Sequence, residues 1–141
     1  VYHGVSDPIF SVADTERWYR GIDRSSGNRA DDFARLYRVP GMGHCSGGPT
    51  VDQFDALTPL VAWVEQGVEP GALTAQARGP GNVGGVNPDV PSDWSATRTR
   101  PLCPYPQVAR YLGRGDVESA ASWRCVGPQG DGHGHGRDHD D

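Results

Sequence analysis

Two short apolar segments of this chain are each followed by a turn and then by residues with helical spacing, and this order limits the possible folds most strongly. Alternating side chains in residues 1–5 and 33–39 predict strands. Apolar residues at helical spacing in residues 11–22 and 54–67 predict helices, and residues 73–77 are expected to form a further short strand. A strand–helix–strand–helix order is typical of a parallel sheet with flanking helices. We therefore predict an α/β fold.

The ends of the two expected helices follow from residues that favour helix termini. Ser11 is a good N-cap, and Asp14 stands in the position of the acidic residue of a capping box. The second helix is expected to end at Gly67. Pro59 inside it leaves two alternatives open, which are a kink at Pro59 or a start with Thr58 as N-cap and Pro59 in the first helical position.

The composition of the chain excludes two classes of partner. All 13 basic residues are Arg and the net charge is -5, so binding of nucleic acid is not expected. No apolar run approaches the ~18 residues of a membrane helix, so no membrane partner is expected either. Residues 1–126 fit one domain, whereas residues 127–141 lack apolar periodicity and predict a disordered tail. The tail histidines fit either a solvated terminus or a metal-binding tract: His133, His135 and His139.

Asp7 and His44 are the candidate functional residues, because each lies in a turn just after a predicted strand. The carboxyl ends of parallel strands meet at one edge of a sheet, where ligands bind. An Asp followed later by a His, both on loops after strands, is also the order of the last two members of the catalytic triad in α/β-hydrolases. The alternative left open is a turn-forming Asp and a histidine on a surface loop.

A nucleophile is harder to assign from the sequence. The serine of such a triad lies in a Gly-x-Ser-x-Gly turn, and the nearest string, around Ser46, lacks the first glycine. Cys45 is adjacent to His44, but neighbours in an extended loop point in different directions, so a Cys45–His44 catalytic pair is the less favoured alternative. Met42 is a candidate for lining a catalytic cleft, on its position beside His44 alone. Because the chain has 3 cysteines, one is unpaired within it.

Four segments of the chain resemble the C-terminal part of the tannase and feruloyl esterase family: YHGVSDP, LYRVPGMGHCSGG, FDALTPLVAWVEQGVEP and RPLCPYPQVARYLGRGDVESAASWRC. The resemblance covers residues 1–78 and 98–126, and its specific part is the His-Cys pair of the PGMGHC loop combined with the following helix end. It implies the C-terminal part of an α/β-hydrolase fold, in a secreted or periplasmic serine esterase. The substrate of the full-length protein would be a small ester of an aromatic acid.

The same resemblance implies roles for five residues. Asp7 matches the acid of the catalytic triad, and His44 matches its base. Cys45 matches the cysteine that, in this family, is bonded to a cysteine directly before the nucleophilic serine. Cys103 and Cys125 match a second, local disulfide.

Several parts of the family pattern have no counterpart in the sequence. These are the Gly-Cys-Ser-x-Gly-Gly turn with the nucleophile, the oxyanion donors, and the lid, in which the calcium site of the family lies. We therefore expect a piece of a longer esterase, with no cofactor site, that is inactive alone and exposes a strand edge and helix faces. A non-catalytic binding module held by disulfides, and an enzyme dependent on Cys45, are the alternatives.

Overall fold

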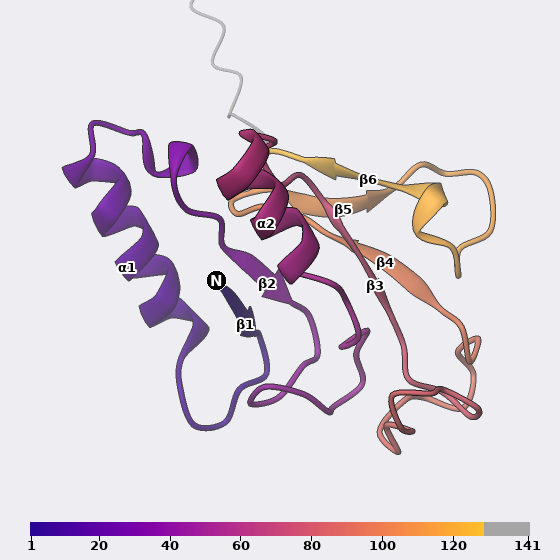
Figure 1. Cartoon of the computed structure of the whole chain (residues 1–141). Coiled ribbons are helices and arrows are strands. Elements are labelled where there is room, and N and C mark those ends of the chain that lie inside the picture. The colour runs from indigo at the N-terminus through magenta and orange to yellow at the C-terminus, as the bar shows by residue number, and fades with distance from the viewer. Residues whose placement is uncertain (129–141) are drawn as a thin grey trace, which may run out of the picture.

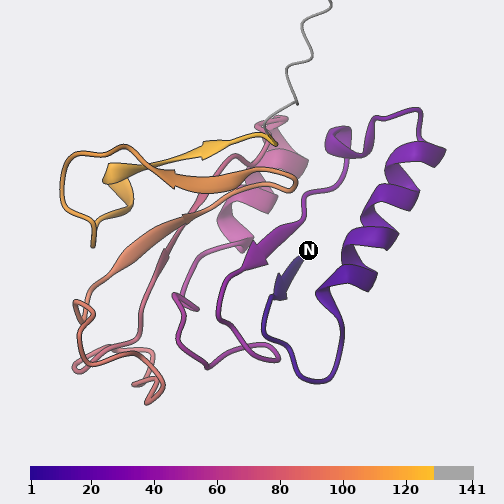
Figure 2. The same cartoon turned by 180° about the vertical axis from the view of Figure 1, so that it is seen from behind.

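The structure is a computed structural model, in which residues 1–128 are described (Figures 1 and 2). Its elements are β1 (Tyr2–Gly4), α1 (Val12–Ser25), η1 (Ala30–Asp32), β2 (Tyr37–Val39), α2 (Leu57–Gln66), β3 (Leu73–Gln76), β4 (Thr99–Leu102), β5 (Val108–Tyr111), η2 (Ala120–Ser122) and β6 (Trp123–Val126). The predicted tail lies outside the described residues, apart from residues 127 and 128, and so do its three histidines. The predicted domain end at residue 126 stays a prediction.

Within residues 1–128, the strands pair in three two-stranded ladders. β1 and β2 are parallel, with Tyr2 opposite Tyr37 and Gly4 opposite Val39. β3 pairs with β4, and β5 pairs with β6, and both of these pairs are antiparallel. The predicted α/β order is therefore present in the first half of the chain, whereas the expectation of parallel strands is wrong for the second half. A parallel pair needs a crossover, usually a helix, and the chain between β3 and β4 holds only turns and irregular structure.

α1 begins where the N-cap predicts it. The Ser11 hydroxyl oxygen accepts a hydrogen bond from the amide of Ala13 at 3.2 Å, which satisfies one of the free amides of the first turn. β2 is shorter than the predicted strand over residues 33–39, because the 3-10 turn η1 precedes it and the amide of Ala34 still bonds to the carbonyl of Ala30. The third expected strand is confirmed as β3.

α2 begins differently from both alternatives that the sequence leaves open. The helix starts at Leu57, and the carboxylate of Asp55 caps it by accepting hydrogen bonds from the amides of Leu57 and Thr58 at 2.9 and 3.0 Å. Pro59 therefore lies in the first turn, where its missing N–H has no intrahelical partner to lose. The expected end at Gly67 is confirmed.

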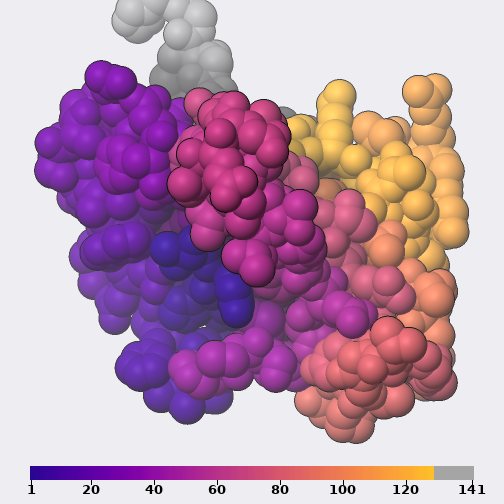
Figure 3. Space-filling model, in the orientation of Figure 1, coloured from indigo at the N-terminus to yellow at the C-terminus, as the bar shows by residue number. Residues whose placement is uncertain are grey.

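The main core lies between the parallel pair and the β3–β4 pair. Eight residues form this buried cluster: Tyr37, Val39, Met42, Val51, Leu73, Ala75, Ala77 and Leu102. Outside it, α2 lies in front of β2 and β3 in Figure 1 and exposes the apolar side chains of Leu57, Leu60, Val61 and Val64. In the space-filling view α2 stands out on the surface (Figure 3). Within residues 1–128, neither helix is long and apolar enough to cross a membrane.

Candidate active site

The parallel pairing of β1 and β2 brings Asp7 and His44 together. The two strands end side by side at Gly4 and Val39, and the segments that follow them lie at the same end of the molecule (Figure 1). Nδ1 of His44 lies 2.8 Å from Oδ2 of Asp7, which is hydrogen-bond distance. Two residues that are far apart in the sequence thus form one polar pair, at the strand edge where the sequence placed both.

The Asp7 carboxylate is enclosed, and both of its oxygens have hydrogen-bond donors. Its side chain is 6% exposed. Oδ1 accepts hydrogen bonds from the amides of Ile9 at 2.8 Å and Phe10 at 3.0 Å, so the turn after Asp7 folds around its own side chain. Burial by itself raises the pKa of the Asp7 carboxyl, but the hydrogen bonds from His44 and from the two amides outweigh it and hold the pKa at about 2. Asp7 is therefore an anion at neutral pH.

An ionised Asp7 determines the tautomer of His44. A carboxylate only accepts hydrogen bonds, so Nδ1 of His44 carries the proton and donates it to Oδ2. Nε2 then holds a lone pair in the neutral imidazole. Within residues 1–128, this nitrogen has no hydrogen-bond partner, and the side chain is 42% exposed. This geometry allows Nε2 to accept a proton while Nδ1 remains bound to the carboxylate, which is what a general base requires.

A second imidazole lies against the same carboxylate, and the sequence reasoning did not single it out. Nε2 of His3 is 3.2 Å from the carbonyl oxygen of Phe10 and 3.5 Å from Oδ2 of Asp7. Because the carbonyl only accepts, Nε2 of His3 is the protonated nitrogen, and its Nδ1 accepts from the Thr15 hydroxyl at 2.8 Å. His3 thereby ties β1 and α1 to the turn that holds Asp7.

Gly4 is needed for the close approach of the two loops. A Cβ placed at Gly4 would fall within 3.0 Å of the carbonyl oxygens of Met42 and Gly43. The amide of Ser6 in the first loop donates to the Met42 carbonyl at 3.0 Å, which joins the two backbones directly. A side chain at Gly4 would push apart the segments that carry Asp7 and His44.

The loop after β2 is held by a distant part of the chain. It is closed by a hydrogen bond from the amide of Gly43 to the carbonyl of Gly47 at 3.0 Å. Gly48 is bound on both sides, because its amide donates to Oδ2 of Asp89 at 3.0 Å and its carbonyl accepts from the side-chain amide of Asn87 at 2.8 Å. The segment over residues 79–92, which the sequence shows only as a Gly/Pro-rich loop, therefore braces the loop of His44.

A buried ion pair fixes the same loop from its other side. The carboxylate of Asp52 has a 0% exposed side chain and accepts from Nε and Nη2 of Arg78 at 2.9 and 2.7 Å. It also accepts from the amide of Gly47 at 2.9 Å. Burial raises the pKa of the Asp52 carboxyl, but these hydrogen bonds outweigh the effect and the pKa is lowered. Neither residue was a candidate from the sequence, since a lone Asp and a lone Arg carry no pattern.

Cys45 adopts a backbone conformation that is uncommon for residues other than glycine. Its φ is 67°, and the amide of Ser46 bonds to the carbonyl of His44 at 2.9 Å, which makes a γ-turn of the strained, positive-φ kind. Its thiol is exposed and free among the described residues, and it makes no hydrogen bond to the His44 ring there. The expected disulfide between Cys103 and Cys125 is present.

Aromatic side chains line the cleft beside the dyad of Asp7 and His44. The cleft has a volume of about 540 Å³, and the ring of Phe10 lies 5.5 Å from that of His44, centre to centre. Phe10 and Trp18 are exposed there, although helical spacing favours a packing role for Trp18. Met42 also lies at this cleft, but it is almost wholly buried and belongs to the core, and its role in a catalytic cleft stays a prediction. In Figure 3 the first residues of the chain lie in a recess at this place.

Comparison with known proteins shows to which family this chain belongs. Residues 1–126 match the family model of tannase and feruloyl esterase. The chain belongs to the tannase and feruloyl esterase family. It is 49% identical to mono(2-hydroxyethyl) terephthalate hydrolase from Piscinibacter sakaiensis, over 91% of this chain and 19% of that protein.

Solved structures of two esterases are similar to this chain. An esterase from Aspergillus oryzae has a TM-score of 0.67 at 27% identity, over 89% of this chain and 26% of that one. Feruloyl esterase B from Aspergillus oryzae has a TM-score of 0.65 at 25% identity, with the same coverage of both chains. The described residues therefore have the α/β-hydrolase-like fold of part of these esterases, and the chain spans about a fifth to a quarter of the length of the relatives it matches.

The calcium ion that the tannase and feruloyl esterase family implies does not fit the residues described. Among residues 1–128, no group of three or more His, Cys, Asp or Glu side chains is arranged to hold a metal ion. The acidic side chains around the Asp7–His44 pair are already engaged, Asp7 with His44, Asp14 with Arg17 and Asp52 with Arg78.

Proposed function

We propose that the protein carrying this chain hydrolyses carboxylic esters of aromatic acids, with Asp7 and His44 as the acid and base of a Ser–His–Asp triad. The observation that carries the proposal is the 2.8 Å hydrogen bond between Nδ1 of His44 and Oδ2 of Asp7, at the end of two parallel strands. Family membership supports the reaction class, and a relative named as a hydrolase of mono(2-hydroxyethyl) terephthalate supports an aromatic ester.

In this proposal His44 moves one proton in each half of the reaction. Nε2 takes the proton of a serine hydroxyl while the serine oxygen attacks the ester carbonyl carbon, and the carbonyl π electrons move to its oxygen. When the tetrahedral intermediate collapses, the carbonyl re-forms, the bond from its carbon to the alcohol oxygen breaks, and His44 gives its proton to that oxygen, which leaves as the alcohol. A water molecule then repeats both steps on the acyl-enzyme, and the aromatic acid is released.

Asp7 acts through His44 in this scheme. The imidazole is cationic between the two proton transfers, and the adjacent carboxylate stabilises that cation and holds the ring in the required tautomer. With a pKa of about 2, Asp7 is ionised at neutral pH. The proton therefore remains on His44 and does not pass to Asp7.

The serine that attacks the ester is proposed to come from outside this chain. Within residues 1–128, no hydroxyl group is hydrogen-bonded to Nε2 of His44. The exposed thiol of Cys45 is proposed to pair with a cysteine next to that serine, which would hold the nucleophile near His44. The 141-residue chain alone is accordingly expected to have no esterase activity.

The triad is tested by Asp7→Asn in the full-length protein, with methyl ferulate or mono(2-hydroxyethyl) terephthalate as substrate. The expected loss in kcat is about 10,000-fold, because the amide cannot hold the required tautomer or stabilise the imidazolium. Asp55→Asn is the matched control, since Asp55 caps α2 and Asn caps a helix equally well. Equal kcat values for the two variants would contradict the triad, and turnover by the 141-residue chain that His44→Ala abolishes would contradict its inactivity.

We further propose that the protein is exported to an oxidising compartment. The disulfide between Cys103 and Cys125 supports this, because disulfides persist in secreted and periplasmic proteins and are rare in the cytosol. Cell fractionation with thiol labelling tests it. Protein confined to the cytosol, with both cysteines reduced, would rule out export.

A further inference from the structure

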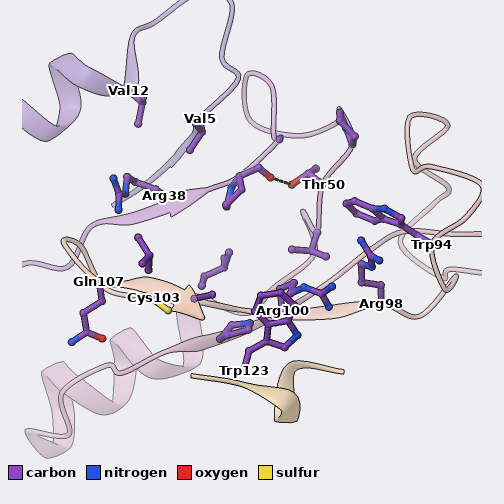
Figure 4. Close-up of a pocket in the computed structure, with 18 of the residues that line it drawn as sticks. Val5, Val12, Arg38, Thr50, Trp94, Arg98, Arg100, Cys103, Gln107 and Trp123 are labelled. Atoms are coloured by element: carbon purple, nitrogen blue, oxygen red, sulfur yellow. Dashed lines mark hydrogen bonds between the residues drawn. The ribbon is translucent and has the colours of Figure 1, made fainter. Parts of the chain in front are cut away.

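A second cavity lies on the other side of β2 from the cleft of Asp7 and His44. It has a volume of about 590 Å³, within the range of pockets that hold small molecules. Its walls come from α1, from β2 and the loop after it, and from β4, β5 and β6 (Figure 4). Not one of its lining residues also lines the cleft beside the dyad. The cavity is therefore a separate site, and the reaction proposed above makes no use of it.

The walls of this cavity combine indole rings with guanidinium groups. The guanidinium of Arg98 lies 3.8 Å from the ring centre of Trp94, and that of Arg100 lies 4.3 Å from the ring centre of Trp123. Figure 4 shows these four side chains gathered toward one end, with Arg38 at the other. Apolar side chains complete the lining, among them Val51 and Leu102.

Two of the three arginines in the cavity are neutralised by acidic partners. Arg38 forms an ion pair with Glu16 at 3.0 Å. Arg98 binds Glu118 through both Nε and Nη2, and the Nε contact is 2.7 Å. The hydrogen bond from Arg98 is the main reason that the pKa of the Glu118 carboxyl lies at about 2, so both members of the pair are charged. Each of these two ion pairs is neutral as a whole, so neither adds a net charge to the cavity.

Of the three arginines that line the cavity, Arg100 forms no ion pair within residues 1–128. Its one hydrogen bond runs from Nη1 to the carbonyl of the neighbouring Thr99 at 2.7 Å, and it forms no ion pair. Glu118 and Asp116 act on it only from a distance. Burial, together with the charge of Arg98, lowers the pKa of the Arg100 guanidinium. A partly desolvated guanidinium that has a cation–π contact but no ion pair keeps unused donors, and an anion that enters the cavity can pair with them.

We propose that this cavity binds a small aromatic carboxylate, with its carboxylate on Arg100 and its ring against the indoles of Trp94 and Trp123. A guanidinium presents a fork of donors that matches the two oxygens of a carboxylate. One face of each indole already lies against a guanidinium, but aromatic rings also pack edge to face, so a benzene ring can still contact both indoles. Phosphate and other inorganic anions satisfy only the charge, so the pairing of one unneutralised arginine with two indoles selects an anion that has an aromatic ring.

The proposal does not depend on the esterase chemistry, although the two fit together. An enzyme that hydrolyses esters of aromatic acids releases aromatic carboxylates, which are the ligands that this cavity would take. The cavity would then hold a released aromatic carboxylate away from His44, or its occupancy would follow the concentration of that product. Binding itself is a property of Arg100 and its neighbours, and it can be measured without any turnover.

Calorimetric titration of the full-length protein with benzoate tests the proposal, with benzamide as the uncharged ligand of the same shape. Benzoate should bind at least tenfold more tightly than benzamide, because a hydrogen-bonded charge pair is replaced by a neutral contact. Arg100→Gln should weaken benzoate at least tenfold and leave benzamide unchanged. Arg100→Lys, which keeps the charge and loses the fork, should fall between the two. Arg114→Gln, an exposed arginine in the turn after β5, is the matched control.

Three outcomes would overturn the proposal. They are equal affinities for benzoate and benzamide, benzoate binding that is unchanged by Arg100→Gln, and no benzoate binding at all because other parts of the protein fill the cavity. A melting curve of each variant shows that it is folded, and a crystal soaked in 4-bromobenzoate locates the ligand by its bromine. His44→Ala should leave benzoate affinity unchanged. If that variant also keeps full esterase activity, the proposed function fails while the carboxylate site stands.

Discussion

Replacing Asp52 by Asn should loosen the loop that carries His44 and lower the free energy of unfolding. The carboxylate accepts three hydrogen bonds, from two nitrogens of Arg78 and from the amide of Gly47. An Asn side chain has the same size, but it has one accepting atom, and its NH2 group would face a donor of Arg78. The substitution therefore breaks a buried ion pair and one of the contacts that hold the loop.

The expected size of this effect follows from the burial of the pair. The side chain of Asp52 is 0% exposed and that of Arg78 is 20% exposed. Removing one partner of a buried pair costs about 3–5 kcal/mol, and Asn keeps part of one hydrogen bond, so we expect about 3 kcal/mol. With a urea dependence of about 2 kcal/mol/M, the unfolding midpoint should fall by about 1.5 M. The domain should remain folded in buffer.

Urea unfolding followed by tryptophan fluorescence measures the midpoint, and hydrogen exchange of the Gly47 amide reports on the loop itself. Exchange at Gly47 should become faster than the change in global stability explains, because its acceptor is lost. Asp55→Asn is again the control, with an expected change within about 0.5 kcal/mol, since the helix cap survives. If Asp52→Asn shifts the midpoint no more than Asp55→Asn does, then the buried pair is not what secures the loop.

Three further measurements test other parts of the structure. The pKa of the Asp7 carboxyl is about 2 in the folded protein and near 3.9 in the unfolded chain, so its ionisation stabilises the folded protein fully above about pH 5 and this stabilisation is lost as the pH falls through 2. The melting temperature should therefore fall less between pH 5 and pH 2 in Asp7→Asn than in the unchanged protein. Gly48→Ala should cost about 3 kcal/mol in urea unfolding, because φ there is +84° and a Cβ would meet the Gly41 carbonyl oxygen; a loss below about 1 kcal/mol would show that the loop yields easily. Reducing the Cys103–Cys125 disulfide, which spans 22 residues, should cost about 3 kcal/mol by calorimetry, and an unchanged melting temperature would show that the bond does not restrain the unfolded chain.

The sequence predicts the Asp7–His44 pair because the rule behind it is local. A strand pattern followed by a turn places a residue at the carboxyl end of a strand, and parallel neighbours bring two such ends together. The cap at Ser11 is predictable for a similar reason, since a cap bonds within its own turn. Asp7 and His44 are far apart in the sequence, but each follows the end of a strand, and the parallel pairing of β1 and β2 brings these two ends together.

The antiparallel half and the brace on the His44 loop were not predictable. β4 has Pro101 inside it, opposite Thr74 of β3, and a proline within a run of residues argues against a strand. Asp89 lies in a segment of turn-forming residues, and turn chemistry shows where a chain bends without showing what it will contact. Contacts of this kind depend on how distant segments pack, and no spacing rule within the sequence encodes them.

The brace on Gly48 divides the Gly/Pro-rich segment into two parts that differ in their tolerance of change. At its tip Val83 is fully exposed, so an insertion there lengthens a surface loop, and the contact nearest to it is the hydrogen bond from the Asn82 side chain to Gln53. At its inner end Asn87 and Asp89 hold the backbone of Gly48, and a shift of one residue would move the loop of His44. For anyone who grafts a tag or a binding peptide onto this protein, the tip is the place to insert it, and the inner end must keep its length.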